Sequence, residues 1–201
     1  MEIVAADVEA YSEAHTTPPP EHLRALFEET HATQECPQML TGPVEGRLLE
    51  TLVWAARPRL VVELGTYSGY SAQFMAGALA PDGRVISCEL DPERAAFARE
   101  HLRDDRVEIR VGPALETLAA IDEPVDLAFV DADKGGYVGY YEALVPKLSR
   151  RGLIVADNTL HGGGSLEGDV MHDFNEHVMA DPRTTCVLLP VRDGITLIRL
   201  A

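Results

Sequence analysis

The chain has 201 residues, of which 46% are hydrophobic and 25% are charged, proportions typical of a globular protein with a continuous core. Acidic residues outnumber lysine and arginine by 33 to 17, which gives a formal net charge of −16 at pH 7. This charge repels phosphate backbones and anionic lipids, so it disfavours nucleic-acid and membrane-surface partners.

The cysteines and the N-terminus point to a reducing compartment. Cys36, Cys88 and Cys186 are an odd number without a CxxC spacing, so neither a disulfide framework nor a zinc cluster is expected. The first ten residues carry three acids and no base, the reverse of a signal peptide, and the apolar runs are too short to span a membrane. These features predict a cytoplasmic protein.

Residues 1–58 are predicted to form a helical N-terminal extension. Pro18-Pro19-Pro20 cannot continue a helix, and the following segment carries a helical apolar stripe at Leu23, Leu26, Phe27 and Thr30. A second helix is predicted with its cap at Thr41 or Gly42 and Pro43 near its first turn; its buried face is formed by Leu48, Leu49, Leu52, Val53 and Ala56. We expect residues 59–201 to form the main domain.

From residue 59 short apolar strands alternate with helices. The predicted strands are Leu60–Leu64, Arg84–Cys88, Val107–Val111, Val125–Val130 and Leu153–Ala156, and the predicted helices lie near 70–80, 92–103, 114–121, 136–149 and 169–180. Strands without polar alternation, separated by helices, indicate a parallel sheet that is covered on both faces.

The last two apolar runs break this alternation. Thr185–Pro190 and Ile195–Leu200 are joined through Asp193-Gly194, which is a strong hairpin signal. The sequence therefore predicts an α/β fold whose seven-stranded sheet carries one antiparallel strand near its C-terminal end. Because such sheets bind ligands at the carboxyl ends of their parallel strands, the functional residues are sought there.

The first strand leads into a glycine turn that is suited to a nucleoside ligand. Gly65 and Gly69 are four residues apart, which is not the G-x-G-x-x-G spacing of a dinucleotide site. Glu89 ends the second strand, where a carboxylate can accept hydrogen bonds from ribose hydroxyls, unless it is only a solvated acid before the next helix. A carboxylate at Glu63 would repel a pyrophosphate but tolerate an ammonium and a sulfonium. This pattern favours S-adenosylmethionine over NAD.

Three motifs in chain order resemble those of the cation-dependent O-methyltransferases, a class I S-adenosylmethionine-dependent family that includes catechol and caffeoyl-coenzyme A O-methyltransferases. They are Glu63-Leu64-Gly65-Thr66-Tyr67-Ser68-Gly69-Tyr70-Ser71, Val130-Asp131-Ala132-Asp133-Lys134 and Ala156-Asp157-Asn158-Thr159-Leu160. The likeness extends from about residue 35 to the end of the chain. It implies a Rossmann-like, seven-stranded methyltransferase sheet and a homodimer.

The resemblance also implies roles for individual residues. Glu89 would hold the ribose of the cofactor, and Gly65 and Thr66 would approach its methionine moiety. The rest of the cofactor site would be lined by Met39, Thr41, Glu63, Ser71, Ala114, Asp131 and Asp133. Met39 has an equally plausible interpretation as a core methionine.

One segment departs from the family pattern. Relatives commonly carry a tryptophan and a polar residue after the Asp-Asn-x-Leu motif, whereas this chain has His161 followed by Gly162-Gly163-Gly164. The acceptor specificity of relatives is therefore not transferred to this chain. We interpret His161 as a loop residue rather than a catalytic base.

The strand-end acids and amide suggest a metal site. Asp131 follows the fourth strand, and Asp157 and Asn158 follow the fifth. Neighbouring residues on a strand face opposite ways, so Asp157 and Asn158 converge only if the strand has already ended. Two carboxylates and an amide oxygen suit Mg²⁺, with Ca²⁺ or Mn²⁺ as alternatives. Three protein ligands leave room for two neighbouring oxygens of a catechol-like acceptor.

Lys134 lies three residues after Asp131 and is expected to face the same site. A nearby divalent cation disfavours its ammonium form, so Lys134 is predicted to be the general base, the alternative being a surface lysine. The sequence thus predicts an S-adenosylmethionine-dependent O-methyltransferase that acts on a vicinal dihydroxy aromatic small molecule. An NAD-dependent oxidoreductase conflicts with the glycine spacing. A non-catalytic S-adenosylmethionine-binding protein would not need Asp131, Lys134, Asp157 and Asn158 together.

Overall fold

The structure is a computed structural model that describes residues 3–201. Its strands form one seven-stranded sheet in the order β3-β2-β1-β4-β5-β7-β6. They are β1 (Leu60–Leu64), β2 (Arg84–Glu89), β3 (Val107–Val111), β4 (Val125–Val130), β5 (Leu148–Ala156), β6 (Thr184–Leu189) and β7 (Ile195–Leu200). Strand β7 runs antiparallel to both of its neighbours, β5 and β6. The predicted α/β sheet with its C-terminal hairpin is confirmed.

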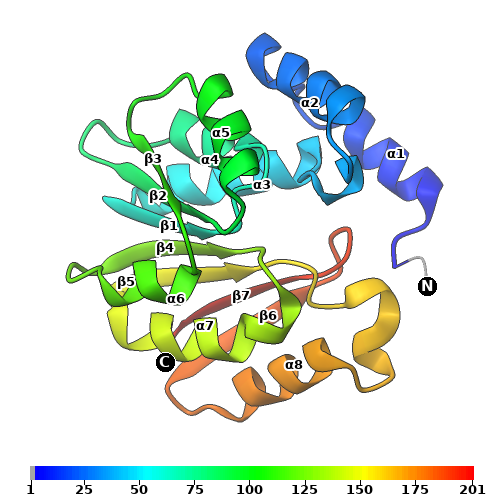
Figure 1. The fold of residues 1–201 in the computed structure, drawn as a ribbon. Coiled ribbons are helices and arrows are strands. Elements are labelled where there is room, and N and C mark those ends of the chain that lie inside the picture. Colours follow the sequence, from blue (N-terminus) through cyan, green and yellow to red (C-terminus); the bar gives the residue numbers. More distant parts are fainter. Residues whose placement is uncertain (1–2) are drawn as a thin grey trace.

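Helices cover both faces of this sheet (Figure 1). The α-helices are α1 (Ala6–Ala14), α2 (Glu21–Thr33), α3 (Pro43–Ala56), α4 (Tyr70–Gly77), α5 (Pro92–His101), α6 (Ala114–Ala119), α7 (Tyr137–Leu144) and α8 (Val170–Ala180). Short 3₁₀ helices occur at η1 (Pro37–Met39), η2 (Lys134–Gly136), η3 (Val145–Lys147) and η4 (His161–Leu166). Figure 1 shows α3, α4 and α5 on one face and α6, α7 and α8 on the other.

Successive residues of each central strand pack into two different hydrophobic cores, one on each face of the sheet. Val61 packs in one core with Leu49 of α3, whereas the adjacent Val62 packs in the other core with Tyr137 of α7. All four side chains are at most 1% exposed. A strand that is buried on both faces has apolar residues without alternation, which explains the uniform apolar runs in the sequence.

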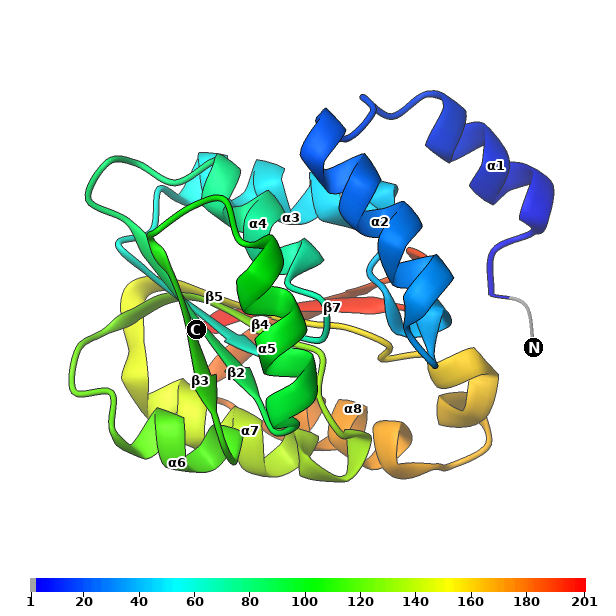
Figure 2. The same ribbon diagram turned by 45° about the horizontal axis from the view of Figure 1, so that its top comes forward.

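The N-terminal helices differ in how closely they pack. Leu49 and Val53 of α3 belong to the core of the sheet, and Leu23 and Leu26 of α2 pack beside Tyr70. Helix α1 has no buried residue, and Figure 2 shows it as the outermost helix, beyond α2. The expected division between residues 1–58 and 59–201 stays a prediction. No helix within residues 3–201 is long and apolar enough to cross a membrane.

Three elements differ from the prediction. The predicted helix over 136–149 ends as α7 at Leu144, because Pro146 cannot continue it. Strand β5 then starts at Leu148 instead of Leu153; Leu148 pairs with Val125, and a register shift separates this pair from the rest of the ladder. Helix α1 was also not predicted, because a helix that buries none of its residues leaves no apolar stripe.

Candidate active site

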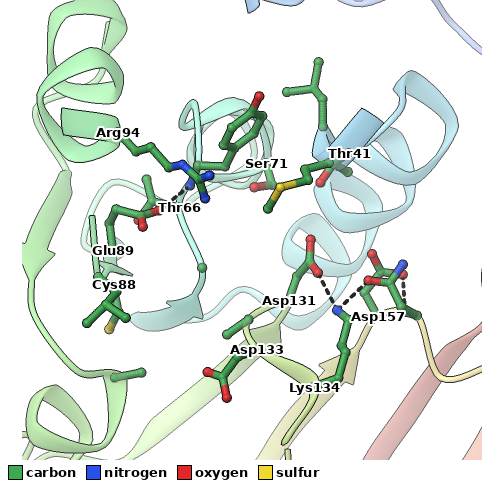
Figure 3. Close-up of a pocket in the computed structure, with 18 of the residues that line it drawn as sticks. Thr41, Thr66, Ser71, Cys88, Glu89, Arg94, Asp131, Asp133, Lys134 and Asp157 are labelled. Atoms are coloured by element: carbon green, nitrogen blue, oxygen red, sulfur yellow. Dashed lines mark hydrogen bonds and ion pairs between the residues drawn. The ribbon is translucent and has the colours of Figure 1, made fainter. Parts of the chain in front are cut away.

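A cavity of about 950 Å³ opens at the carboxyl ends of β1, β2, β4 and β5. Twelve of the predicted site residues line it: Met39, Thr41, Gly65, Thr66, Ser71, Glu89, Ala114, Asp131, Asp133, Lys134, Asp157 and Asn158. Figure 3 shows Glu89 and Thr66 at one end of this cavity and Asp131, Lys134 and Asp157 at the other. The strand-end rule pointed to residues such as Glu89, Asp131, Asp157 and Asn158, and the family resemblance supplied Met39, Thr41, Ser71, Ala114 and Asp133.

The glycine turn brings two strand ends into contact. Gly65 adopts φ +98°, and a Cβ atom at this position would lie 2.0 Å from the main-chain oxygen of Asp131. The Gly65 amide donates to Cys88 O at 3.0 Å, and the Asp131 amide donates to Leu64 O at 2.9 Å. A residue with a side chain would fit neither this backbone conformation nor this approach, so glycine is required here.

Glu89 is fixed by main-chain hydrogen bonds. Its Oε2 accepts from the Tyr67 amide at 2.8 Å and its Oε1 from the Asp91 amide at 3.0 Å. The residue is 8% exposed and lines the cavity. Each carboxylate oxygen has a further lone pair, so Glu89 can organise the glycine turn and still accept hydrogen bonds from a ligand.

Glu63 is the predicted site residue that does not line the cavity. It is fully buried in β1, where Ser71 Oγ donates to its Oε1 at 2.5 Å and Ser87 Oγ donates to its Oε2. Burial raises the pKa of the Glu63 carboxyl to about 8, so the group is largely protonated at pH 7. Ser71 lies between Glu63 and the cavity and forms the wall there.

The predicted metal ligands meet where β5 ends. The strand stops at Ala156, and Asn158 turns the chain in a left-handed conformation with φ +55°, as convergence of the two side chains requires. Lys134 Nζ lies 3.0 Å from Asp131 Oδ1 and 2.6 Å from Asn158 Oδ1. Figure 3 shows Lys134 between Asp131 and Asp157. Two of the three predicted ligands, Asp131 and Asn158, therefore contact the ammonium group of Lys134.

The surroundings of Asp157 carry excess negative charge. Asp157 is 3% exposed and Glu45 of α3 is fully buried; burial, then the charge of Glu45, raise the pKa of Asp157 well above its usual value. Glu45, Asp131 and Asp157 face two cationic groups, Lys134 and Arg192. A divalent cation would compensate this charge, and the ligands are all oxygen, so the residues fit such an ion.

The predicted metal site includes the amide of Asn158 as well as two carboxylates. Within residues 3–201 no group of three His, Cys, Asp or Glu side chains is arranged to hold a metal ion. A three-residue site at Asp131 and Asp157 would therefore need the amide oxygen of Asn158 as its third ligand.

Sequence reasoning missed three residues around this end of the cavity. Tyr137 accepts a hydrogen bond from Lys134 at 2.8 Å, and its position three residues after Lys134 was an available signal. Arg192 lines the cavity and donates to Glu45 at 2.7 Å. Glu45 and Arg192 are 147 residues apart, and nothing in the local sequence of either residue indicated the pair.

Comparison with known proteins identifies the family. A family model described as O-methyltransferase matches residues 12–201. A catechol O-methyltransferase of Mycobacterium tuberculosis is 41% identical over 138 residues, which cover 66% of this chain and 62% of that protein. The aligned region thus spans less than two thirds of that relative. A caffeoyl-CoA O-methyltransferase of Nicotiana tabacum is 31% identical over 90% of this chain and 84% of its own length.

The fold comparison agrees with the sequence comparison. The SAH-bound methyltransferase PaMTH1 of Podospora anserina superposes with a TM-score of 0.93 at 29% identity, and the match covers 98% of this chain and 95% of that one. The chain therefore belongs to the O-methyltransferase family. It is a methyltransferase, as the three motifs predicted, and the oxidoreductase and non-catalytic alternatives are set aside.

Proposed function

We propose that the chain transfers a methyl group from S-adenosylmethionine to one hydroxyl of a vicinal dihydroxy aromatic molecule, with a divalent cation held by Asp131, Asp157 and Asn158. The observation that carries this proposal is the contact of Lys134 Nζ with Asp131 and Asn158 in one cavity that also contains Glu89. The cavity can thus hold a nucleoside at one end and an acceptor at the other.

The cofactor assignment rests on the fixed carboxylate of Glu89 and on the relatives. PaMTH1 is described as SAH-bound, and SAH is the form that S-adenosylmethionine takes after it gives up its methyl group. In this chain Glu89 would accept hydrogen bonds from the ribose, and Gly65 and Thr66 would lie along the methionine moiety. Met39, Thr41, Ser71, Ala114 and Asp133 would complete the binding site.

The acceptor end supplies orientation and a proton acceptor. When bound, the divalent cation would lower the pKa of an acceptor hydroxyl and favour two adjacent acceptor oxygens. Lys134 Nζ would take the hydroxyl proton, and its contacts with Asp131, Asn158 and Tyr137 hold it in place. The acceptor oxygen would then form a bond to the methyl carbon as the sulfur–carbon bond breaks. No covalent intermediate with the enzyme is required, and orientation is the main contribution of the protein.

A matched pair of acceptors tests this proposal. A catechol should exceed a monophenol with identical other substituents by at least about tenfold in kcat/KM, which corresponds to about 1.4 kcal/mol. Excess chelator should abolish turnover reversibly, and Asp157→Ala should abolish it in a folded protein, whereas Asp173→Asn on the exposed face of α8 should not. Equal rates for the two acceptors, or full activity without metal, would overturn the metal-dependent mechanism.

The expectations about partners stay predictions. These are a small-molecule aromatic acceptor, a homodimer, a cytoplasmic location, and the absence of nucleic-acid and membrane partners. Light scattering coupled to gel filtration measures the oligomeric state directly, and a monomer at micromolar concentration would contradict the expected homodimer.

A further inference from the structure

His161 forms part of the cavity wall beside the predicted metal ligands. Its main-chain amide donates to Asn158 O at 3.1 Å, so residues 158–161 make one turn. Both His161 and Asn158 adopt left-handed conformations, with φ +47° and +55°. Such conformations are uncommon for residues other than glycine, and they concentrate at functional sites.

Asp169 fixes the orientation of the His161 ring. Its Oδ2 contacts His161 Nδ1, while its Oδ1 accepts from the Met171 and His172 amides at 2.9 and 3.1 Å as the N-cap of α8. The contact with His161 and the helix amides lower the pKa of Asp169. The carboxylate accepts a hydrogen bond from Nδ1, so in the neutral imidazole the hydrogen lies on Nδ1 and Nε2 is the nitrogen with the lone pair.

The glycine-rich loop makes this contact possible. A Cβ atom at Gly164 would lie 2.3 Å from Asp169 Oδ2 and 3.6 Å from His161 Nδ1. Gly164 therefore leaves the space in which the two side chains meet. This gives a physical role to part of the segment in which the sequence departs from the family pattern.

We propose that His161 recognises the acceptor: its Nε2 accepts a hydrogen bond from an O–H or N–H group that lies outside the two vicinal oxygens. No other group in residues 3–201 forms a hydrogen bond with Nε2, and the side chain is 43% exposed. Lys134, the proposed base, already contacts Asp131 and Asn158. Proton transfer and recognition of the acceptor are therefore assigned to two different side chains, Lys134 and His161. A site built to accept a hydrogen bond discriminates against an acceptor without the donor, because its own polar atom is then left unpaired.

This inference rests on the proposed function and specifies its acceptor class as catechols with an additional hydrogen-bond donor. The test uses catechols with a hydroxymethyl or a methoxymethyl group at ring position 3 or position 4. The hydroxymethyl group donates a hydrogen bond and the methoxymethyl group does not. The wild-type protein should prefer the hydroxymethyl compound at one of the two positions by at least about fivefold in kcat/KM.

Two variants and one control locate the source of the preference. His161→Phe removes the accepting nitrogen, and Gly164→Ala displaces Asp169 from His161. Both variants should bring the selectivity ratio, which is kcat/KM for the hydroxymethyl compound divided by kcat/KM for the methoxymethyl compound, close to one. His177→Phe is the matched control, because the similarly exposed ring of His177 in α8 also contacts an acid, Glu142, at 2.7 Å but does not line the cavity. The selectivity ratio of the His177→Phe variant should equal that of the wild type.

The outcomes separate the two proposals. If the wild type methylates all four catechols without preference, or if His161→Phe retains the preference, the role of His161 is overturned and the proposed function stands. If the wild type with cofactor and Mg²⁺ methylates none of them, the proposed function itself fails.

Discussion

The guanidinium of Arg192 donates a hydrogen bond to the Glu45 carboxylate at 2.7 Å, which joins α3 to the turn between β6 and β7. Glu45 is fully buried, whereas the Arg192 side chain is 31% exposed. Burial raises the pKa of Glu45, and the charge of Arg192 opposes this. The pair therefore connects the helix before the sheet to the C-terminal hairpin beside the acceptor end of the cavity.

Removal of Arg192 should destabilise the fold. Arg192→Met leaves the buried Glu45 carboxylate without its counter-charge, which should lower the free energy of unfolding by about 2–4 kcal/mol. Urea denaturation measures this, with Arg199→Met on the exposed side of β7 as the control. Adding Glu45→Gln to the Arg192 variant should recover part of the loss. Equal midpoints for Arg192→Met and the wild type would contradict this account.

Glu63 should make stability depend on pH. The folded protein holds its carboxyl proton up to about pH 8, whereas the unfolded chain loses it near the ordinary glutamate pKa of about 4.3. The folded state therefore binds more protons between these values, so the free energy of unfolding falls as pH rises through this window and levels off above it.

The comparison with Glu63→Gln isolates this effect, because other buried acids contribute equally to both proteins. In the absence of cofactor, the stability of the wild type relative to Glu63→Gln should be constant below pH 4 and decrease by as much as about 4 kcal/mol by pH 8. Chemical denaturation at a series of pH values measures the difference. A difference that does not change with pH would show that Glu63 is ionised in the folded protein.

Loss of the Glu89 carboxylate should weaken cofactor binding. Glu89→Ala removes the proposed ribose contacts and leaves the Tyr67 and Asp91 amides without their acceptor, so S-adenosylmethionine affinity should fall by about 1–3 kcal/mol. Calorimetry measures the affinity, with Glu93→Ala on the exposed surface of α5 as the control. Unchanged affinity for a folded Glu89→Ala protein would remove Glu89 from the cofactor site.

Two glycine-to-alanine changes should have opposite effects. Gly65→Ala places a Cβ 2.0 Å from Asp131 O at φ +98°, so it should cost more than about 3 kcal/mol or prevent folding. Gly139 lies in α7, and a Cβ atom added there would meet nothing within 4 Å, so Gly139→Ala should add about 0.5–1 kcal/mol. Thermal denaturation compares both with the wild type; a stable Gly65→Ala protein would contradict the close approach of β1 and β4.

The sequence alone determined the sheet and most of the cavity wall. Leu60–Leu64, Val107–Val111 and Val125–Val130 form strands with the predicted bounds. The first and the last lie inside the sheet and are short apolar runs between turns, whereas Val107–Val111 is an edge strand that alternates apolar and charged residues. A parallel sheet binds its ligands at the carboxyl ends of its strands. The residues that follow the predicted strands, such as Asp131, could therefore be assigned to one site. Both signals are local in the sequence, and so they could be read without coordinates.

Tertiary packing decided the rest. Burial behind Ser71 withdraws Glu63 from the cavity and raises its pKa, and the register shift against Val125 lengthens β5. The contacts of Arg192 with Glu45 and of Asp169 with His161 join side chains from separate elements. Hydrophobic periodicity reports which face of an element is buried, but it carries no information about which polar groups meet when distant segments pack. Those contacts determine the charge and the hydrogen bonding at the acceptor end of the cavity, and they form only when the chain folds.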